Sequence, residues 1–211
     1  MTFLIKDLGL CNFESVYQDM VDFTLSRDES TADEIWLLEH EPVYTLGLAG
    51  DRQHILNNQS IPVIETDRGG QVTYHGPGQL IAYLMIDLKR RPYAIKKLVN
   101  LIESTLIDTL DSLGIKGERK NKAPGVYVNG DKIAALGIRV KKESSYHGLA
   151  LNVDMDLSPF NGINPCGYAD LKCCQVSDYI PDIKMQTIKK ELVKQLIKHL
   201  DVEQTKMNNV A

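Results

Sequence analysis

The sequence of 211 residues lacks any apolar run long enough to cross a membrane, since a spanning helix needs about 20 consecutive apolar residues. Its first residues, MTFLIKDLGLCNFESV, carry charges at Lys6 and Asp7, and no small-residue cleavage site follows a long apolar segment. These absences argue against a membrane-spanning helix and an export signal. We therefore expect a cytoplasmic protein.

Positive charge is not in excess either. The chain has 24 Lys and Arg against 28 Asp and Glu, which gives a formal net charge of −4. This balance argues against broad electrostatic capture of nucleic acid or of an anionic membrane. An acidic partner would have to meet a local basic patch.

Cysteine is scarce and shows no metal-binding spacing. The four residues are Cys11, Cys166, Cys173 and Cys174; none forms a CxxC pair, and Cys166 precedes Cys173 by seven positions. We therefore expect no structural zinc and no other metal. In an intracellular protein these residues are expected to be reduced thiols.

A nucleotide-phosphate motif is also missing. The stretch RGGQVTYHGPGQ (68–79) has four glycines, but it matches neither GxxxxGK[ST] nor GxGxxG and leads into an apolar strand rather than a helix. Without a helix N-terminus there is no dipole to hold a phosphate, so we expect no cofactor. A simple hairpin needs one or two glycines, and the others favour a surface where backbone approaches a ligand closely.

Hydrophobic periodicity predicts a single α+β domain over residues 1–211, with a mixed, largely antiparallel sheet flanked by helices. Helices are predicted after an N-cap at Asn12, over 93–113 and over 185–200, with a frayed tail at 201–211. Strands are predicted at 34–40, 42–48, 61–67, 79–88 and 146–157, and Asn129-Gly130 predicts a hairpin turn within 125–140.

One thiol stands in a context typical of an accessible loop. Cys166 lies between Pro165 and Gly167 in NGINPCGYADLKCCQVSDY, a segment with few apolar residues. A free cysteine is more often a packing residue than a nucleophile, and that interpretation applies to the other three. The Pro-Cys-Gly context fixes the backbone on one side and leaves room on the other, which favours a nucleophilic role for Cys166.

A nucleophilic cysteine needs a neighbouring cation, because an unperturbed thiol of pKa about 8.5 supplies little thiolate at neutral pH. The candidates are Lys132, His75, His147 and Arg139. Lys132 stands between the predicted turn and the apolar run IAALGI. The alternatives are a solvated lysine beside a turn and, for His75 and His147, hydrogen-bonded structural roles.

Four long motifs carry a family resemblance. They are RGGQVTYHGPGQLIAYLMIDL, GDKIAALGIRV, YHGLALNVDMDLSPF and INPCGY. In order and spacing they resemble the lipoyl(octanoyl) transferases, the octanoyl-[acyl carrier protein]:protein N-octanoyltransferases, over about residues 30–180. The resemblance implies a fold similar to the catalytic domain of biotin and lipoate protein ligases.

The resemblance also implies roles for individual residues. Cys166 matches the nucleophile that carries the acyl chain as a thioester, and Lys132 matches the lysine that lowers the pKa of that thiol. The residues that match the substrate-binding segments are Arg68, Gly69, Gly70, Gln71, Val72, Thr73, Tyr74, His75, Ala135, Leu136, Gly137, Gly148, Leu149 and Ala150.

The implied reaction transfers octanoyl (or lipoyl) from octanoyl-acyl carrier protein to a lysine of lipoyl domains, in the 2-oxoacid dehydrogenases and the glycine cleavage H protein. It needs no ATP. We expect a basic rim for these acidic partners, with Arg68, Arg139, Lys141 and Lys142 contributing. Two alternatives stay open: an ATP-dependent lipoate or biotin ligase without a cysteine intermediate, and a non-catalytic module that binds acyl groups or lipoyl domains.

Overall fold

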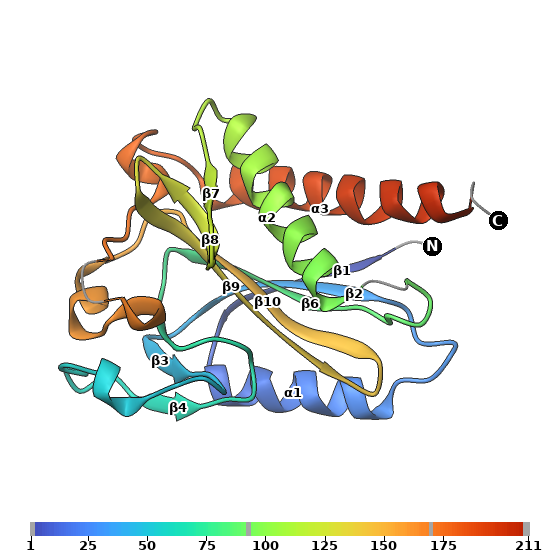
Figure 1. The fold of residues 1–211 in the computed structure, drawn as a ribbon, viewed down its shortest axis with the longest axis horizontal. Helices are drawn as coiled ribbons and strands as arrows, with labels where there is room; N and C mark the ends of the chain where they lie inside the picture. Colours follow the sequence, from blue (N-terminus) through green and yellow to red (C-terminus); the bar gives the residue numbers. More distant parts are fainter. Residues whose placement is uncertain (1–2, 92–93, 169–170, 209–211) are drawn as a thin grey trace.

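The computed structural model describes residues 3–91, 94–168 and 171–208, with the side chains of all of these except Cys166 and residues 201–208. The strands form a seven-stranded sheet in the order β1-β2-β6-β10-β9-β8-β7 and a three-stranded sheet in the order β4-β3-β5 (Figure 1). The large sheet contains β1 (Leu4–Cys11), β2 (Glu34–His40), β6 (Gln79–Met85), β7 (Glu118–Lys120), β8 (Ala123–Val128), β9 (Asp131–Lys141) and β10 (Ser144–Asn152). The small sheet contains β3 (Val43–Leu46), β4 (Val63–Glu65) and β5 (Val72–His75).

The predicted mixed, largely antiparallel sheet is confirmed. In the large sheet β1 pairs with β2 in parallel, and the other neighbouring strands pair antiparallel. Three α-helices are α1 (Phe13–Ser26), α2 (Ile95–Asp111) and α3 (Met185–Asn208). Short 3-10 helices are η1 (Arg52–His54), η2 (Ser158–Gly162), η3 (Pro165–Gly167) and η4 (Val176–Asp178).

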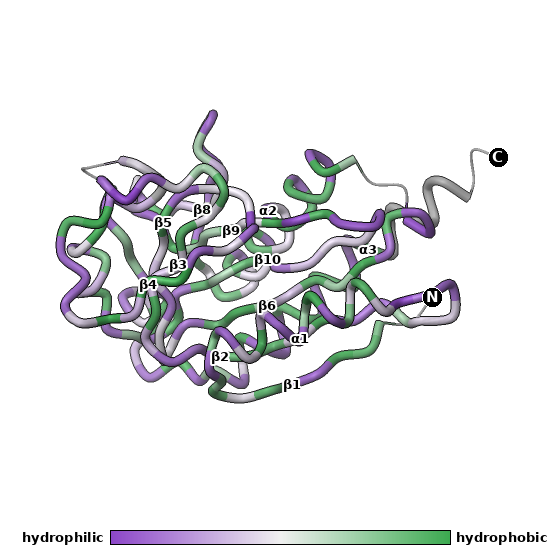
Figure 2. The backbone as a smooth tube through the Cα atoms, turned by 90° about the horizontal axis from the view of Figure 1, so that it is seen from below, coloured by the Kyte–Doolittle hydropathy of each residue, from purple (hydrophilic) through white to green (hydrophobic). Residues whose placement is uncertain are grey.

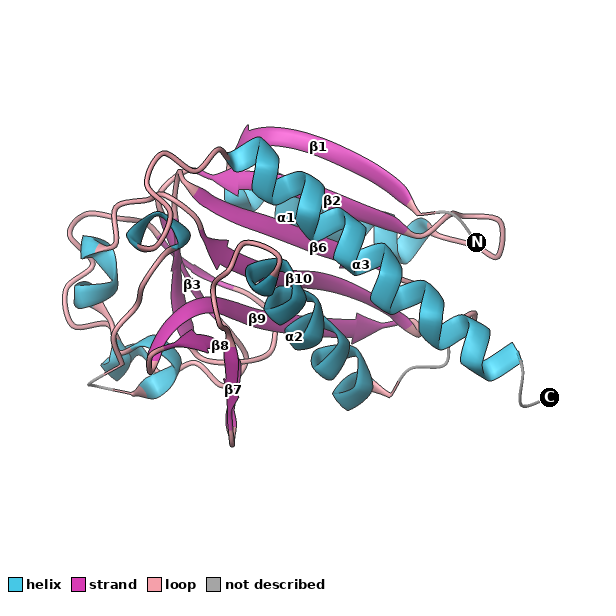
Figure 3. Ribbon diagram, turned by 90° about the horizontal axis from the view of Figure 1, so that it is seen from above, coloured by secondary structure: helices cyan, strands magenta, loops and turns pink. Residues whose placement is uncertain are grey.

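Helices cover both faces of the large sheet. In Figures 1 and 3, α2 and α3 lie together on one face and α1 lies on the other. The apolar stripe of α2 explains its position, because Leu98, Ile102, Leu106 and Leu110 are at most 1% exposed in the core cluster that includes residues of α3. Burial of each such side chain contributes about 1.5–3 kcal/mol to folding.

The central strand β6 is buried on both faces, as its unbroken apolar run predicts. Leu80, Ala82 and Leu84 belong to the cluster beneath α2 and α3. Ile81, Tyr83 and Met85 belong to the cluster that packs against α1. The alternation of side chains along β6 thus assigns Ile81 and Tyr83 to the α1 side of the sheet.

The predicted hairpin turn is confirmed. Asn129 and Gly130 have φ of 51° and 92°, and Val128 pairs directly with Asp131. Positive φ at both central positions matches the twist of the flanking strands, which explains the Asn-Gly pair. Lys132 consequently lies one residue inside β9.

Several element boundaries differ from the prediction. β1 was not predicted because Lys6 and Asp7 interrupt its apolar residues; Leu4, Leu8 and Leu10 remain exposed along a sheet edge, and Figure 2 shows β1 as a mixture of hydrophobic and hydrophilic residues. β5 was not predicted because it lies inside the glycine-rich stretch, where its pairing with β3 decides the conformation. α3 continues to Asn208, so residues 201–208 belong to its backbone and not to a frayed tail. The predicted start of α2 at Tyr93 lies outside the described residues.

Within the described ranges, no helix is both long and apolar enough to span a bilayer.

Candidate active site

A cavity on the α1 side of the large sheet brings together distant segments of the chain. It is lined by Phe13, Arg68, Gly70, Gln71, Val72, Thr73, His75, Ile81, Tyr83, Ala135, Leu136, Gly137, His147, Gly148, Leu149 and Ala150. The list contains both predicted strand segments in full and six of the eight residues predicted between Arg68 and His75. Gly69 and Tyr74 are the two that do not line it.

Strand register explains why two of these segments share one wall. In the β9–β10 pair, Gly137 is opposite Gly148, Leu136 is opposite Leu149, and Ala135 is opposite Ala150. The two segments are therefore neighbours across the sheet although ten residues separate them. Ala135, Gly137, Gly148 and Ala150 have a methyl group or no side chain, which leaves space beside this wall, whereas Leu149 belongs to the core on the opposite face of the sheet.

Glycine is required where backbone meets backbone around the cavity. A Cβ on Gly148 would collide with the carbonyl oxygen of Ala82 in β6. A Cβ on Gly137 would lie 2.8 Å from the carbonyl oxygen of Gly69. The glycines therefore allow close packing of the cavity walls, in addition to any approach to a ligand.

The guanidinium of Arg68 is buried inside this wall. Arg68 is 8% exposed and donates to the carbonyl oxygens of Thr45, Gly69 and Gln71 and to the Thr45 hydroxyl, at 2.7–3.1 Å. The prediction that Arg68 contributes to a basic rim is therefore wrong. Its bonds join β3 to the loop before β5 and fix that loop.

The other residues predicted for the rim lie on β9 and the β9–β10 turn. Arg139 is half-buried near Asp67, with its Nε 3.8 Å from Oδ2. Lys141 and Lys142 are exposed, and Nζ of Lys142 donates to the carbonyl oxygen of Leu25 in α1. These two lysines thus stand at the hairpin tip, away from the strand positions that line the cavity.

Tyr74 belongs to a separate apolar cluster. Its ring packs edge-on to Phe160 at 5.5 Å and is tilted against Tyr44 at 5.5 Å. The alternation along β5 explains this, since His75 lies on the cavity side. Gly69 instead donates its N–H to the carbonyl oxygen of Ile138 at 3.2 Å, which joins the loop to β9.

Phe13, Ile81 and Tyr83 line the cavity but were not predicted as site residues. Their helix and strand patterns are those of ordinary core residues, so no motif marks them. Phe13 begins α1, where Asn12 caps the helix as predicted by accepting from the N–H of Ser15 at 3.3 Å. The ring of Phe13 lies 5.1 Å from that of His40 and 6.3 Å from that of His75.

The histidines beside this ring are held neutral. Burial lowers the pKa of His75 to about 3, and the repulsion that a protonated His75 would feel from a protonated His40 and from Arg68 adds to the effect. Burial likewise lowers the pKa of His40 to about 4. Nδ1 of His75 donates to Oε1 of Gln79 at 2.7 Å, and Nδ1 of His40 donates to the Cys11 carbonyl oxygen at 3.1 Å. His75, which lines the cavity, and His40, which lies behind the Phe13 ring, are therefore uncharged at neutral pH.

A third histidine of this region, His147, is held by Asp67. Nε2 of His147 lies 3.2 Å from Oδ1 of Asp67, and the Tyr146 hydroxyl also donates to Asp67. Burial alone would raise the pKa of Asp67, but hydrogen bonds from His147, Tyr146 and Tyr17 outweigh burial and lower it. Burial lowers the pKa of His147 despite Asp67, so the pair is best described as a neutral imidazole donating to a carboxylate.

Lys132 points inward. It is 4% exposed, and its Nζ donates to the carbonyl oxygen of Pro124 at 3.0 Å. Gly125 makes room for it, because a Cβ there would lie 2.6 Å from Cε of Lys132. This burial excludes the interpretation of Lys132 as a solvated lysine beside a turn.

The backbone of Lys132 is joined to the segment that follows Cys166. The N–H of Lys132 donates to the carbonyl oxygen of Lys172 at 2.8 Å, and the N–H of Cys174 donates to that of Lys132 at 3.0 Å. Cys166 itself lies in η3, where Asn164 bonds back to His54 and Gly167 approaches Gln71 of the cavity wall. The Cys166 side chain lies outside the described residues, but its turn adjoins both the cavity and the Lys132 segment.

The other thiols are in packing positions. Burial raises the pKa of Cys174 to about 11, and this residue is part of the main core. Burial also raises the pKa of Cys11. Cys173 packs against the Tyr74 cluster. Among the side chains that the structure describes, which exclude Cys166 and residues 201–208, no group of three or more metal-binding residues comes together.

Known proteins are similar to this chain in sequence and in fold. Residues 17–197 match the family model of the lipoyl protein ligase A/B catalytic domain. An octanoyltransferase of Pseudomonas entomophila is 53% identical over 202 residues, covering 95% of this chain and 94% of that protein. An octanoyltransferase of Vibrio cholerae is 49% identical over 208 residues, covering 99% of this chain and 96% of that protein.

Solved structures extend the likeness to more distant proteins. A crystal structure of lipoate-protein ligase A bound with ATP has a TM-score of 0.80 at 14% identity and covers 95% of this chain and 86% of that chain. Biotin protein ligase from Aquifex aeolicus has a TM-score of 0.54 at 12% identity and covers 95% of this chain and 69% of that chain. At these identities the likeness concerns the fold.

Proposed function

Because the chain belongs to the lipoyl protein ligase A/B catalytic-domain family and, within it, to the octanoyltransferases, we propose that it is an acyltransferase of protein lipoylation. It moves an octanoyl group from acyl carrier protein to a lysine of a lipoyl domain, by way of a thioester on Cys166. The observation that carries this proposal is the apolar cavity beside the turn of Cys166, with the buried Lys132 joined to the same region.

The cavity suits an unbranched acyl chain. Its wall of Ala135, Gly137, Gly148 and Ala150 offers a surface without polar side chains, and the histidines that line it, His75 and His147, remain uncharged. Arg68 also lines the cavity, but its guanidinium is already hydrogen-bonded to backbone carbonyl oxygens, so an aliphatic chain there does not leave this charge without partners. We assign the substrate-binding role to the cavity residues, with Gly69 supporting the wall through its bond to Ile138.

The first half of the reaction is a thioester exchange. The Cys166 thiolate attacks the carbonyl carbon of the donor thioester, a new C–S bond forms, and the donor C–S bond breaks to release the carrier thiol. A buried ammonium at Lys132 favours the thiolate of Cys166 and can supply the proton that the leaving thiol takes up. No bond to phosphate is made or broken, so the exchange needs no ATP.

The second half makes an amide. The amine of the acceptor lysine attacks the Cys166 thioester, a C–N bond forms, and the Cys166 thiolate leaves. Lys132, as a neutral amine after the first half, takes the proton that the attacking amine loses. The product amide is more stable than the thioester, which drives the transfer. The acyl donor and acceptors named above, and the cytoplasmic location, belong to this proposal.

The deciding experiment is intact-mass measurement after incubation with octanoyl-acyl carrier protein in the absence of nucleotide. The expected result is a hydroxylamine-sensitive octanoyl adduct that is lost in Cys166→Ala and kept in the matched variant Cys173→Ala. Transfer to a lipoyl domain should be lost with the adduct. An ATP-dependent ligase would transfer only with nucleotide present, and a binding module would give no adduct; either result would overturn the proposal.

A further inference from the structure

A second and larger hollow adjoins the acyl cavity. It encloses about 1230 Å³ of empty space, part of it open to solvent. We call it the arm groove and define it by Ile95, Val99, Lys122, Pro124, Leu136 and Tyr168, which line it. The arm groove and the acyl cavity share the lining residues Gly70, Gln71, Leu136 and Gly137, so the two spaces adjoin each other at β9 and the loop before β5.

The inner end of the arm groove lies at the reacting groups. Gly167 and Tyr168, the two residues that follow Cys166, line it. Pro124 lines it as well, and the carbonyl oxygen of Pro124 accepts from Nζ of Lys132 at 3.0 Å. A thioester whose acyl chain occupies the cavity would therefore have its sulfur at this junction, with the rest of the donor extending into the groove.

We propose that the arm groove binds the phosphopantetheine arm of the acyl donor, an inference that rests on the proposed function. The arm alternates short apolar stretches with two amides and carries a branched apolar group next to its phosphate. The groove offers the matching surfaces: the apolar side chains of Ile95 and Val99 on one side and the polar side chains of His54 and Gln71 on the other.

The size of the groove favours the donor arm over the acceptor lysine. A lysine has a four-carbon stem, so it would occupy only the inner end near Tyr168. The groove continues outward to Ile95 in the first turn of α2, a residue that is 54% exposed. A long arm is the occupant that uses this outer part.

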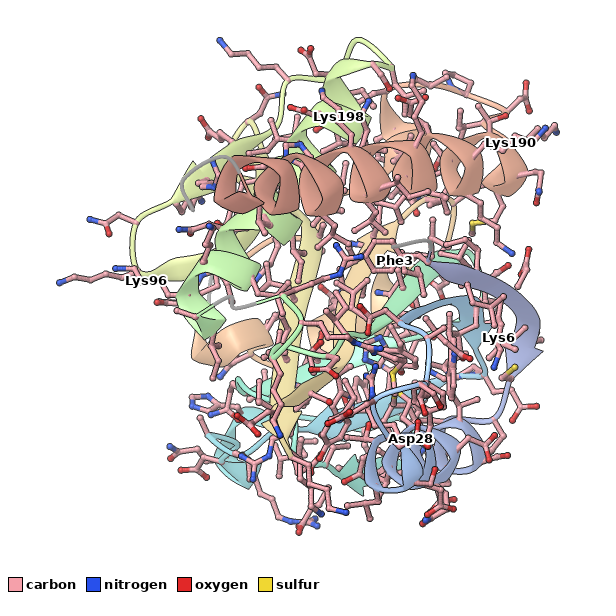
Figure 4. All side chains as sticks on the ribbon, turned by 90° about the vertical axis from the view of Figure 1, so that its right-hand side faces the viewer. Phe3, Lys6, Asp28, Lys96, Lys190 and Lys198 are labelled. Atoms are coloured by element: carbon pink, nitrogen blue, oxygen red, sulfur yellow. The ribbon has the colours of Figure 1, made fainter. Side chains whose placement is uncertain are left out.

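Positive charge at the outer part matches the phosphate. Lys122 lines the groove from the turn between β7 and β8, is exposed, and forms no ion pair with any of the residues for which side chains are described. Lys96, next to Ile95 on α2, extends away from the body of the protein (Figure 4). The ammonium group of Lys122 would bind the phosphate of the arm by charge-assisted hydrogen bonds.

The test compares three octanoyl donors in the first half-reaction, read as the rate of adduct formation by intact mass. The donors are octanoyl-phosphopantetheine, octanoyl-pantetheine and p-nitrophenyl octanoate, whose leaving group is too short to fill the groove. Ile95→Trp, which fills the outer groove, should lower kcat/KM for octanoyl-phosphopantetheine relative to p-nitrophenyl octanoate by about tenfold. Lys122→Ala should lower kcat/KM for octanoyl-phosphopantetheine relative to octanoyl-pantetheine by about threefold to tenfold.

Leu10→Trp is the matched control, because Leu10 is 58% exposed on β1 at the opposite edge of the large sheet. It should leave both ratios at their wild-type values. Equal losses of kcat/KM with all three donors, or unchanged kcat/KM ratios between donors in Ile95→Trp, would overturn the proposal that the arm groove binds the phosphopantetheine arm. Absence of an adduct from every donor with the wild-type protein would instead overturn the proposed function, and the groove's role with it.

Discussion

Nζ of Lys132 lies 3.0 Å from the carbonyl oxygen of Pro124, so a buried ammonium is held by backbone beside the turn that carries Cys166. A carbonyl oxygen accepts from this ammonium without neutralising its charge. In the proposed mechanism this charge acts on the Cys166 thiolate, and burial means that it acts through little water. This arrangement depends on Gly125, whose lack of a side chain leaves space for the lysine.

Replacement of Lys132 by alanine should raise the pKa of the Cys166 thiol. A nearby cation stabilises the thiolate, so its loss should shift the pH midpoint of Cys166 alkylation upward by about one unit or more. The measurement is peptide mass mapping after timed alkylation at a series of pH values. Lys141→Ala, on the exposed hairpin tip, is the control and should keep the wild-type midpoint. An unchanged midpoint in Lys132→Ala would remove the lysine from this role.

Asp67→Asn should destabilise the protein most at neutral pH. The carboxylate accepts from Tyr146 and His147, and its removal leaves buried donors poorly matched, at a cost of about 1–3 kcal/mol. The pKa of Asp67 is lowered in the folded state, so its contribution is present above the unfolded pKa of about 4 and is lost as the pH falls further.

Urea unfolding of wild type and Asp67→Asn at pH 7 and below pH 4 measures this difference. The gap in unfolding free energy should narrow at the lower pH. Asp19→Asn, on the exposed face of α1, should show no such gap. If the difference in unfolding free energy between wild type and Asp67→Asn were the same below pH 4 as at pH 7, Asp67 would not be the ionised acceptor described here.

His40→Gln should flatten the loss of stability on acidification. His40 titrates with a pKa of about 4 when folded and about 6.5 when unfolded, so below pH 6.5 the unfolded state binds a proton that the folded state does not. Stability therefore falls between pH 6.5 and about 4, with His40 contributing about 1–2 kcal/mol of that fall by pH 5.

The quantity to compare is the change in unfolding free energy between pH 7 and pH 5. It should be smaller in His40→Gln than in wild type, whatever the variant's stability at pH 7. His54→Gln, at a less buried ring beside η3, is the matched substitution to measure alongside it. Equal changes in wild type and His40→Gln would show that His40 is not held neutral.

The sequence predicts the cavity best where the walls are built by strand register. Gly148 and Gly137 lie in motifs whose apolar and glycine pattern already requires paired strands, and the structure places them opposite each other. It predicts the burial of Arg68 poorly, because that burial depends on Thr45, which belongs to another strand 23 residues earlier. A hydrogen bond between residues so far apart in the chain produces no recognisable pattern in the local sequence.

The missed cavity residues show the same limit. Ile81 and Tyr83 follow the alternation of a core strand, and whether such a side chain meets another side chain or an empty space depends on the packing of α1. Periodicity predicts which face of the strand a side chain lies on, but it does not predict whether that side chain meets another side chain or an empty space. Phe13 is missed for the same reason.

Phe13 should limit the length of the acyl chain. Its ring is 3% exposed, lines the cavity from the start of α1 and packs against His40 and His75, so a smaller side chain would extend the cavity toward those rings. Phe13→Leu should therefore raise the ratio of dodecanoyl to octanoyl adduct formed from matched donors by about threefold to tenfold, since each added methylene gains about 0.8 kcal/mol of burial.

The control for Phe13→Leu must lose a similar amount of core packing without touching the cavity. Phe160→Leu meets this need, because Phe160 packs on Tyr74 in the separate cluster and does not line the acyl cavity. Both variants should be destabilised in thermal unfolding, since each removes buried aromatic atoms. The chain-length ratio should change in Phe13→Leu alone. A parallel change in Phe160→Leu would mean that general loosening, and not the Phe13 ring, sets the length.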